Sequence, residues 1–342
     1  MTPLRRLLIL AVSVLVLAGV GTGLVLHAAS RAGEKTRPQA GGPAIAAGPV
    51  SLTEPGDLLV LNQARGPYLD RLVSVPAGSP SSTRTASGLT CLRFYAAAGT
   101  GVCLQSVPGA LTTSGRAVIV DSGLHTLHTF PLAGTPSRAR VSPSGHLAAW
   151  TVFVGGESYG AAFFSTRTSI VDTRTWKLTS SLEDYSITLD GKPYHNIDVN
   201  FWGVTFAADD DTFYATLGTG GHTYLVRGSI SRQSVTTLIQ NVECPSLSPD
   251  GTRIAFKKRV LAGAALWREY VLDLSTLHET PTAEHKSVDD QATWLDGHTL
   301  AYSLPTPGVS GSNDLWSVPA DGTGAPKLLL SGAFSPTPAV AP

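Results

Sequence analysis

The sequence has no excess of charge of either sign. Its 25 Lys and Arg residues balance its 25 Asp and Glu residues, and charged residues make up only 15% of the chain. Proteins that bind nucleic acid usually carry a basic excess or a basic stripe. The composition therefore gives no indication of a nucleic-acid partner, and we expect none.

Helical periodicity is also scarce. Beyond residue 51, no segment keeps the helical period of about 3.6 residues for long enough to predict a helix. Gly (35) and Pro (23) are frequent, whereas Met occurs once. The short apolar stretches are rich in Val, Ile, Leu, Tyr and Trp, and polar turns separate them. This pattern predicts an all-β domain.

Metal-ligand motifs are missing as well. The sequence has no H-E-x-x-H motif and no closely spaced cysteine pair of the C-x-x-C kind. We therefore assign no metal ligand, no cofactor and no catalytic residue. Cys91 and Cys103 flank a stretch with a turn near its middle, so a β-hairpin there would bring them together as a disulfide in an oxidising compartment. Cys244 is left over, and we expect it to be a small buried side chain.

The N-terminus carries the clearest targeting signal. Arg5 and Arg6 precede an uncharged run from Leu7 to Leu26, which as a helix would be about 30 Å long, the thickness of a bilayer core. Small residues follow at 28–30, so a cleaved signal peptide is the alternative to an uncleaved anchor. In both cases the arginines keep the N-terminus in the cytoplasm. We expect either a single-pass protein of the cytoplasmic membrane with its C-terminal domain outside, or a secreted one.

The chain divides into three parts on this basis. Residues 1–30 form the membrane anchor or signal peptide. Residues 31–50 are rich in Pro, Gly and Ala without periodicity, which is typical of a flexible tether. Residues 51–342 form the predicted β domain.

One phrase recurs along this β domain. The stretch SLSPDGTRIAF, which begins at Ser246, places a Ser-Pro-Asp-Gly turn between two short apolar segments. Related phrases start roughly 40 to 65 residues apart, close to the spacing of four-stranded propeller blades. Each one except the last is followed by a second apolar strand that ends in polar turn residues. The copies begin at Leu92, Val141, Thr205, Leu247, Thr293 and Phe334.

The two ends of the domain complement each other. The last copy, near Phe334, has a first strand but no second half. The first strands after the tether, DLLVLNQ and DRLVSVPAG, are not preceded by a copy of the recurring phrase. Together they would make one blade from both ends of the chain, which closes a ring and removes exposed sheet edges. The sequence therefore predicts a six-bladed β-propeller.

The repeat resembles that of a known family. The SPDG turn, the IAF strand after it and the later YVLDLST strand are similar to the repeats of TolB-like, WD-type β-propellers, over about residues 55–340. The resemblance implies protein binding, which is common in this family, although similar blades also precede the catalytic domains of prolyl-oligopeptidase-like enzymes. The chain departs from TolB itself, which has an extra N-terminal domain where this chain has an apolar segment and a tether.

Candidate surface residues come from stretches that precede the first strands of the blades. Carboxylate and imidazole groups there could gather around one mouth of the axial channel, and aromatic side chains could serve as exposed binding anchors. The long Gly-rich and aromatic insertion between the copies at Val141 and Thr205 is a further candidate for a partner surface. The surface residues proposed on this basis are His195, Asp198, Phe201, Trp202, Glu243, Asp289 and Asp290.

Two functional hypotheses follow. The first is a non-enzymatic scaffold or sensor outside the membrane that binds a protein of the cell envelope. The alternative is a propeller whose axial channel binds a ligand or a metal ion, as a hydrolase or lactonase-type enzyme would. The alternative requires inward-pointing Asp, Glu, Asn or His side chains from several blades at one mouth.

Overall fold

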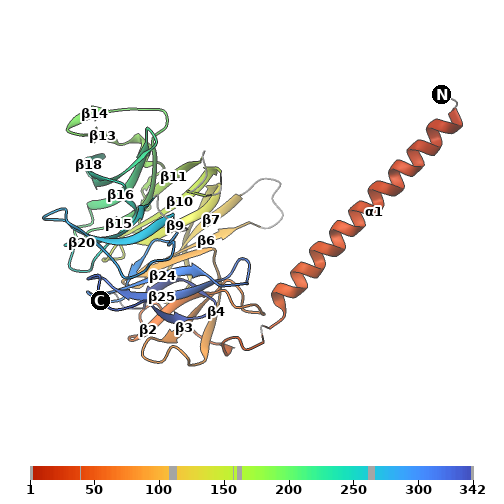
Figure 1. The fold of residues 1–342 in the computed structure, drawn as a ribbon, viewed down its shortest axis with the longest axis horizontal. Helices are drawn as coiled ribbons and strands as arrows, with labels where there is room; N and C mark the ends of the chain where they lie inside the picture. Colours follow the sequence, from red (N-terminus) through yellow and green to blue (C-terminus); the bar gives the residue numbers. More distant parts are fainter. Residues whose placement is uncertain are drawn as a thin grey trace.

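The computed structural model describes residues 3–38, 40–107, 114–156, 158–159, 164–260 and 266–339. One long helix, α1 (Pro3–Thr36), projects away from a ring of β-sheets (Figure 1). Its segment Pro3–His27 is long and apolar enough to cross a membrane, by length and composition.

The β-sheets are the six blades of a propeller. Five of them contain four consecutive strands that run in order from the innermost strand outward. The innermost strands are β5 (Arg93–Ala97), β9 (Thr135–Val141), β15 (Asn200–Phe206), β19 (Glu243–Leu247) and β23 (Thr293–Trp294). The outer strands of these blades are β6 (Thr100–Ser106), β7 (Ser114–Val120), β8 (Thr126–Ala133), β10 (Leu147–Gly155), β11 (Ser165–Asp172), β12 (Leu178–Thr179), β16 (Thr212–Thr219), β17 (His222–Ser229), β18 (Ser234–Gln240), β20 (Arg253–Arg259), β21 (Trp267–Asp273), β22 (Glu279–Pro281), β24 (Thr299–Pro305), β25 (Asn313–Pro319) and β26 (Lys327–Leu330).

The sixth blade closes the ring with both ends of the chain, as the sequence predicts. Its innermost strand, β27 (Ala333–Pro338), comes from the C-terminus and pairs antiparallel with β2 (Asp57–Asn62). The blade continues through β3 (Arg71–Pro76) and β4 (Arg84–Thr90). This pairing satisfies the backbone groups that both strands would otherwise expose at a sheet edge.

The repeated phrase folds in the same way in different blades. In Ser248–Gly251 the amide of Gly251 donates to the carbonyl of Ser248 at 2.9 Å, and Asp250 accepts from the amide of Thr252 at 3.0 Å. In the copy at Ser142, the amide of Gly145 donates to the carbonyl of Ser142 at 2.8 Å. Both glycines have positive φ angles, +71° and +78°, which residues with a Cβ rarely adopt. The phrase is therefore the hairpin turn between the first two strands of a blade.

The segment expected to be a flexible tether is partly regular. Helix α1 continues to Thr36, and β1 (Ile45–Ala47) pairs in parallel with β4, in the register Ile45↔Arg84. The structure differs from the expectation because β4 is the outermost strand of its blade and offers free backbone groups. The short Pro-free stretch at 44–47 can bond to them.

The long interval between two copies holds an insertion. It forms the short 3₁₀ helix Leu182–Asp184 and a hairpin of β13 (Ser186–Leu189) and β14 (Lys192–Tyr194). Strand β13 adds in parallel to β18, so this blade has six strands (Figure 1). The insertion therefore widens one blade at its outer edge.

The cysteines are placed in two ways. Cys91 and Cys103 form a disulfide with a Cα–Cα distance of 5.4 Å, within the blade that begins with β5. Cys244 is a free thiol and is buried. It packs with Trp202 and Trp267 beneath the site described next.

Candidate binding cleft

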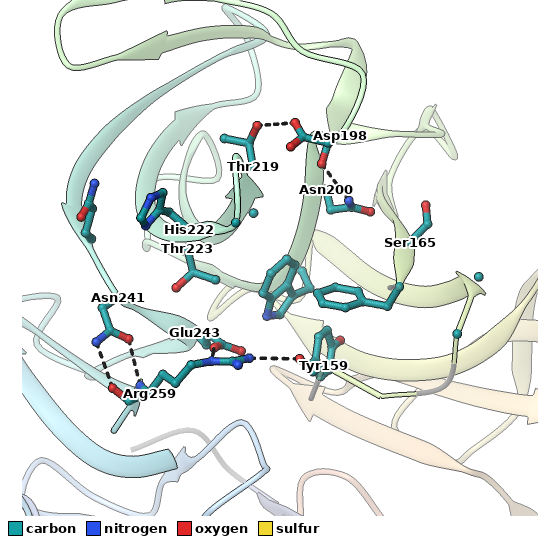
Figure 2. A pocket seen from close by; sticks show the side chains of 17 residues that line it. Tyr159, Ser165, Asp198, Asn200, Thr219, His222, Thr223, Asn241, Glu243 and Arg259 are labelled. Carbon is teal, nitrogen blue, oxygen red and sulfur yellow. Dashed lines mark hydrogen bonds and ion pairs between the residues drawn. The ribbon is translucent and has the colours of Figure 1, made fainter. Parts of the chain in front are cut away.

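A cleft of about 1130 Å³ opens on the face of the ring where the innermost strands begin. It lies between three consecutive blades, those that begin with β9, β15 and β19. Its walls come from the end of β10, the start of β15, the β16–β17 turn and the end of β20 (Figure 2). The cleft is therefore off the propeller axis.

The floor of the cleft is aromatic. The ring of Tyr159 stacks on Trp202 with centroids 5.2 Å apart, and Phe164 meets Trp202 edge-on at 5.4 Å. Tyr159 is further held by a hydrogen bond of 2.7 Å between its hydroxyl and Ser137 Oγ. Burial raises the pKa of Tyr159, so its hydroxyl stays protonated at neutral pH.

Phe201 and Trp202 are not the exposed anchors that the sequence suggested, since each is only 1% exposed. The rings of Tyr159 and Phe164 cover Trp202, and Phe201 packs into the core between two blades. Gly218 makes room for the indole, because a Cβ at position 218 would lie 2.7 Å from the ring. Trp202 therefore forms the base of the cleft.

Polar side chains form one rim. Asp198 accepts a hydrogen bond from Thr219 Oγ1 at 2.5 Å (Figure 2). It also accepts one from the amide of Gly220 at 2.7 Å. These bonds, that of Thr219 first, lower the pKa of Asp198. His222 is exposed and Thr223 is partly exposed beside them. Asp198 is thus an ionised group that fixes the β16–β17 turn.

The opposite wall is a buried ion pair. Glu243 is 1% exposed and accepts a hydrogen bond from Trp267 Nε1 at 2.9 Å. Its carboxylate lies 3.6 Å from Arg259 Nε and 3.9 Å from Lys257 Nζ. Arg259 also donates to the carbonyl of Tyr159 at 3.2 Å (Figure 2). Arg259 therefore connects the backbone of Tyr159 to Glu243 in this wall.

The axial mouth beside the cleft is rich in cations. Lys257 Nζ lies 2.5 Å from Asp289 Oδ1, and Arg138 Nη2 lies 3.4 Å from the same atom. Burial by itself would raise the pKa of Asp289, but Lys257 and Arg138 outweigh it and lower that pKa. Asp290 accepts from the amides of Gln291 and Ser303. Both carboxylates are thus bound by donors of the protein.

The proposed surface residues fall into three places. Asp198, Trp202 and Glu243 line the cleft. Asp289 and Asp290 lie at the axis, and His195 is exposed and lines neither the cleft nor the axis. Within the described ranges, no group of three His, Cys, Asp or Glu side chains is arranged to hold a metal ion.

Sequence reasoning missed the basic side chains. The innermost strand β9 carries Arg138 and Arg140 at alternate positions, and β20 ends in Lys257, Lys258 and Arg259. Alternate residues of a strand point to the same face of the sheet. The alternating arginines of the stretch SRARV therefore indicate two cations on one face of an innermost strand. This pattern was not used.

Sequence reasoning also passed over a G-x-S-x-G spacing at 156–160, around Ser158. In α/β hydrolases this pattern forms a sharp turn from a strand into a helix. Here it lies between the antiparallel strands β10 and β11 of one blade. Residues 157 and 160 of the pattern lie outside the described residues.

Comparison with known proteins supports the fold class. No model of a known protein family matches the chain, and no curated protein matches it. Among solved structures, the chain is similar to TolB from Acinetobacter baumannii, with a TM-score of 0.53 and 18% identity over 84% of this chain and 67% of that one. The likeness confirms the expected TolB-like six-bladed propeller.

Two other solved structures also align with the chain. A chain of the nidogen–laminin complex aligns with a TM-score of 0.52 and 9% identity, over 82% of this chain and 97% of that one. A puromycin-hydrolysing peptidase of Mycobacterium tuberculosis aligns with a TM-score of 0.45 and 15% identity, over 80% of this chain and 42% of that one. At 9% identity, the likeness to the chain of the nidogen–laminin complex extends to the fold alone.

Proposed function

We propose that the protein is a non-enzymatic binding propeller that works outside the cytoplasmic membrane and takes a segment of an envelope protein into the off-axis cleft. The observation that carries this proposal is the cleft itself, an open volume of about 1130 Å³ with an aromatic floor and a polar rim. Ligand sites commonly combine an apolar lining with a few placed polar groups. The apolar helix α1 supports attachment to the membrane, or export through it if the helix is cleaved.

The carboxylates of the cleft favour binding over acid–base chemistry. Asp198 is held by Thr219 and Gly220, and Glu243 is held by Trp267 beside two cations. Each group stabilises the wall in which it lies. A general acid or base needs a pKa near the working pH and a free path to the substrate.

The axial channel, the alternative site, is less suited to an organic ligand. A cavity lined by Arg93, Arg140 and Asp290 at the axis measures only about 30 Å³. The channel also carries Arg and Lys among the acidic groups that a metal ion would require. The cleft is therefore the better candidate for a partner or a ligand.

Site-specific photo-crosslinking in cells tests the proposal. A photoreactive residue replaces His222 at the cleft, and in a matched variant it replaces Arg232. Both side chains are exposed; His222 is the first residue of β17, and Arg232 lies in the turn after its other end, between β17 and β18. We expect a defined envelope protein to crosslink from position 222 and not from position 232.

A cleft-filling variant gives the control. Thr223→Trp places a large ring in the cleft and should remove the crosslink from position 222. Equal capture from both faces, or capture that survives the filled cleft, would contradict the proposal. A small molecule that copurifies with the wild type and is lost from the filled variant would instead favour a ligand-binding role.

A further inference from the structure

A small cavity lies on the propeller axis and belongs to no part of the cleft. Side chains of four innermost segments line it, from β5, β9, the stretch before and into β23, and β27. Its volume is about 30 Å³, which is enough for about two water-sized guests. Nothing as large as a sugar or a peptide side chain with several carbons fits there.

Three arginines, Arg93, Arg138 and Arg140, line this cavity, and Asp290 is the only acidic residue among the described residues that line it. The guanidinium of Arg138 donates to Cys244 Sγ, to the carbonyl of Ser137 and to Asp289. Arg138 and Arg140 are 7% and 5% exposed. Arginine offers donors only and stays charged in proteins. The lining is therefore strongly biased toward a guest that accepts hydrogen bonds and carries negative charge.

The donors of Arg140 are incompletely used. Its Nη2 donates to Ser246 Oγ at 3.3 Å and to the carbonyl of Ala292 at 3.1 Å. Its Nε is buried and has no hydrogen-bond partner among the described residues. A buried unpaired donor on a charged group is costly, so this atom points to a missing acceptor.

The surrounding charges do not balance the three arginines. Asp289 is shared between Arg138 and Lys257, and Lys257 also lies 3.9 Å from Glu243. Asp289, Asp290 and Glu243 thus offset three of the four cations Arg93, Arg138, Arg140 and Lys257. The carboxyl of Glu269 has its pKa raised to about 8, mainly by burial and then by Asp290, so it adds little negative charge at neutral pH. The cluster keeps an excess of positive charge in a site with little access to water, where an uncompensated charge is strongly destabilising.

We propose that the axial cavity binds a small monovalent anion, of the size of chloride or formate, between Arg93 and Arg140, while Arg138 adds positive charge beside it. The anion supplies the acceptor that Arg140 Nε lacks and offsets the positive charge. Because its ligands come from β5 and β9, it also joins neighbouring blades at the mouth next to the cleft. This role is separate from partner binding and does not depend on it.

Thermal unfolding of the full-length protein in detergent tests the site. The buffer holds ionic strength constant while sodium gluconate, whose anion is too large for the cavity, is replaced by sodium chloride or sodium formate. Bound anion stabilises the folded state by mass action. We expect Tm to rise by roughly 2–4 °C for each tenfold increase of anion above its dissociation constant.

The responses to the two salts distinguish a site for an inorganic ion from a site for a carboxylate. A response to chloride indicates a free inorganic ion, and a response to formate alone indicates a site shaped for a carboxylate. Equal Tm values in all three salts would overturn the proposal.

Two variants assign the effect to the cavity. Arg140→Gln should abolish the dependence of Tm on the anion. Arg116→Gln, at an exposed arginine of β7, should keep it. An unchanged response in Arg140→Gln would place the anion elsewhere and contradict the proposal.

Crystals of the wild type soaked in bromide give a second measurement, which holds even if Arg140→Gln does not fold. An anomalous peak between Arg93 and Arg140 is expected. Its absence would contradict the proposal.

Discussion

Glu269 is a buried carboxyl group that we expect to lower the stability of the protein as pH rises. Its side chain is 0% exposed, and neither carboxyl oxygen has a hydrogen-bond partner among the described residues. Burial, followed by the nearby Asp290, raises its pKa from 4.5 to about 8, although Lys257 on the paired strand β20 acts in the opposite direction. The perturbation we consider is Glu269→Gln, which keeps the shape and removes the titration.

The sign of the effect follows from proton counting. Between pH 4.5 and pH 8 the folded protein holds a proton on Glu269 that the unfolded chain has released. Stability falls with pH wherever the folded state binds more protons than the unfolded state. The loss therefore begins near the unfolded pKa of 4.5 and levels off above the folded pKa of about 8. With about 1.4 kcal/mol for each pKa unit, the wild type should lose about 3 kcal/mol between pH 5 and pH 8 from this group.

Urea unfolding of the full-length protein in detergent, at pH 5, 6, 7 and 8, measures this loss. We expect Glu269→Gln to remove about 3 kcal/mol of the decline in unfolding free energy across that range. Glu54→Gln, at an exposed glutamate, serves as the matched control and should leave the decline unchanged. If the wild type and Glu269→Gln showed the same pH dependence, Glu269 would be ionised in the folded state and the reasoning would fail.

The remaining predictions concern three other parts of the fold. Replacing both Cys91 and Cys103 with Ala opens a loop of sequence separation 12 and should cost about 2–4 kcal/mol by chain entropy. Reduction of the wild type should lower its Tm to that of the double variant. Gly218→Val should cost about 1–3 kcal/mol and shift tryptophan fluorescence, because its side chain meets the indole of Trp202; unchanged fluorescence would argue against this packing. Lys257→Met leaves the buried glutamate of the cleft with one cation fewer and should cost about 3 kcal/mol in urea unfolding, whereas a neutral result would mean that the ion pair adds no stability.

The fold was predictable because it is repetitive. The turn phrase around Ser248–Gly251 depends on local chemistry, namely a glycine at positive φ and an aspartate that binds backbone amides. Such a pattern can be recognised in the sequence because it does not depend on contacts with the rest of the chain. Its spacing predicted the blade count, and the incomplete copies at both ends predicted the ring closure between β2 and β27.

The site was only partly predictable because it forms between blades. Trp202 looked like an exposed anchor, since it lies at the beginning of an innermost strand. It is buried because Tyr159, far from it in sequence and on another blade, stacks on it at 5.2 Å. No local pattern specifies that contact.

The charges at the axis were also only partly predictable from the sequence. The sequence shows the acidic residues Asp289 and Asp290 and also the basic alternation at Arg138 and Arg140. Only the tertiary structure decides that strands from different blades bring these groups to one axis, where Lys257 pairs with Asp289 at 2.5 Å. Sequence alone determined the apolar N-terminal segment, the repeated blade and its closure, because these follow from short-range patterns. The cleft and the cationic axis follow from long-range packing, which fixes the distances between side chains that are remote along the chain.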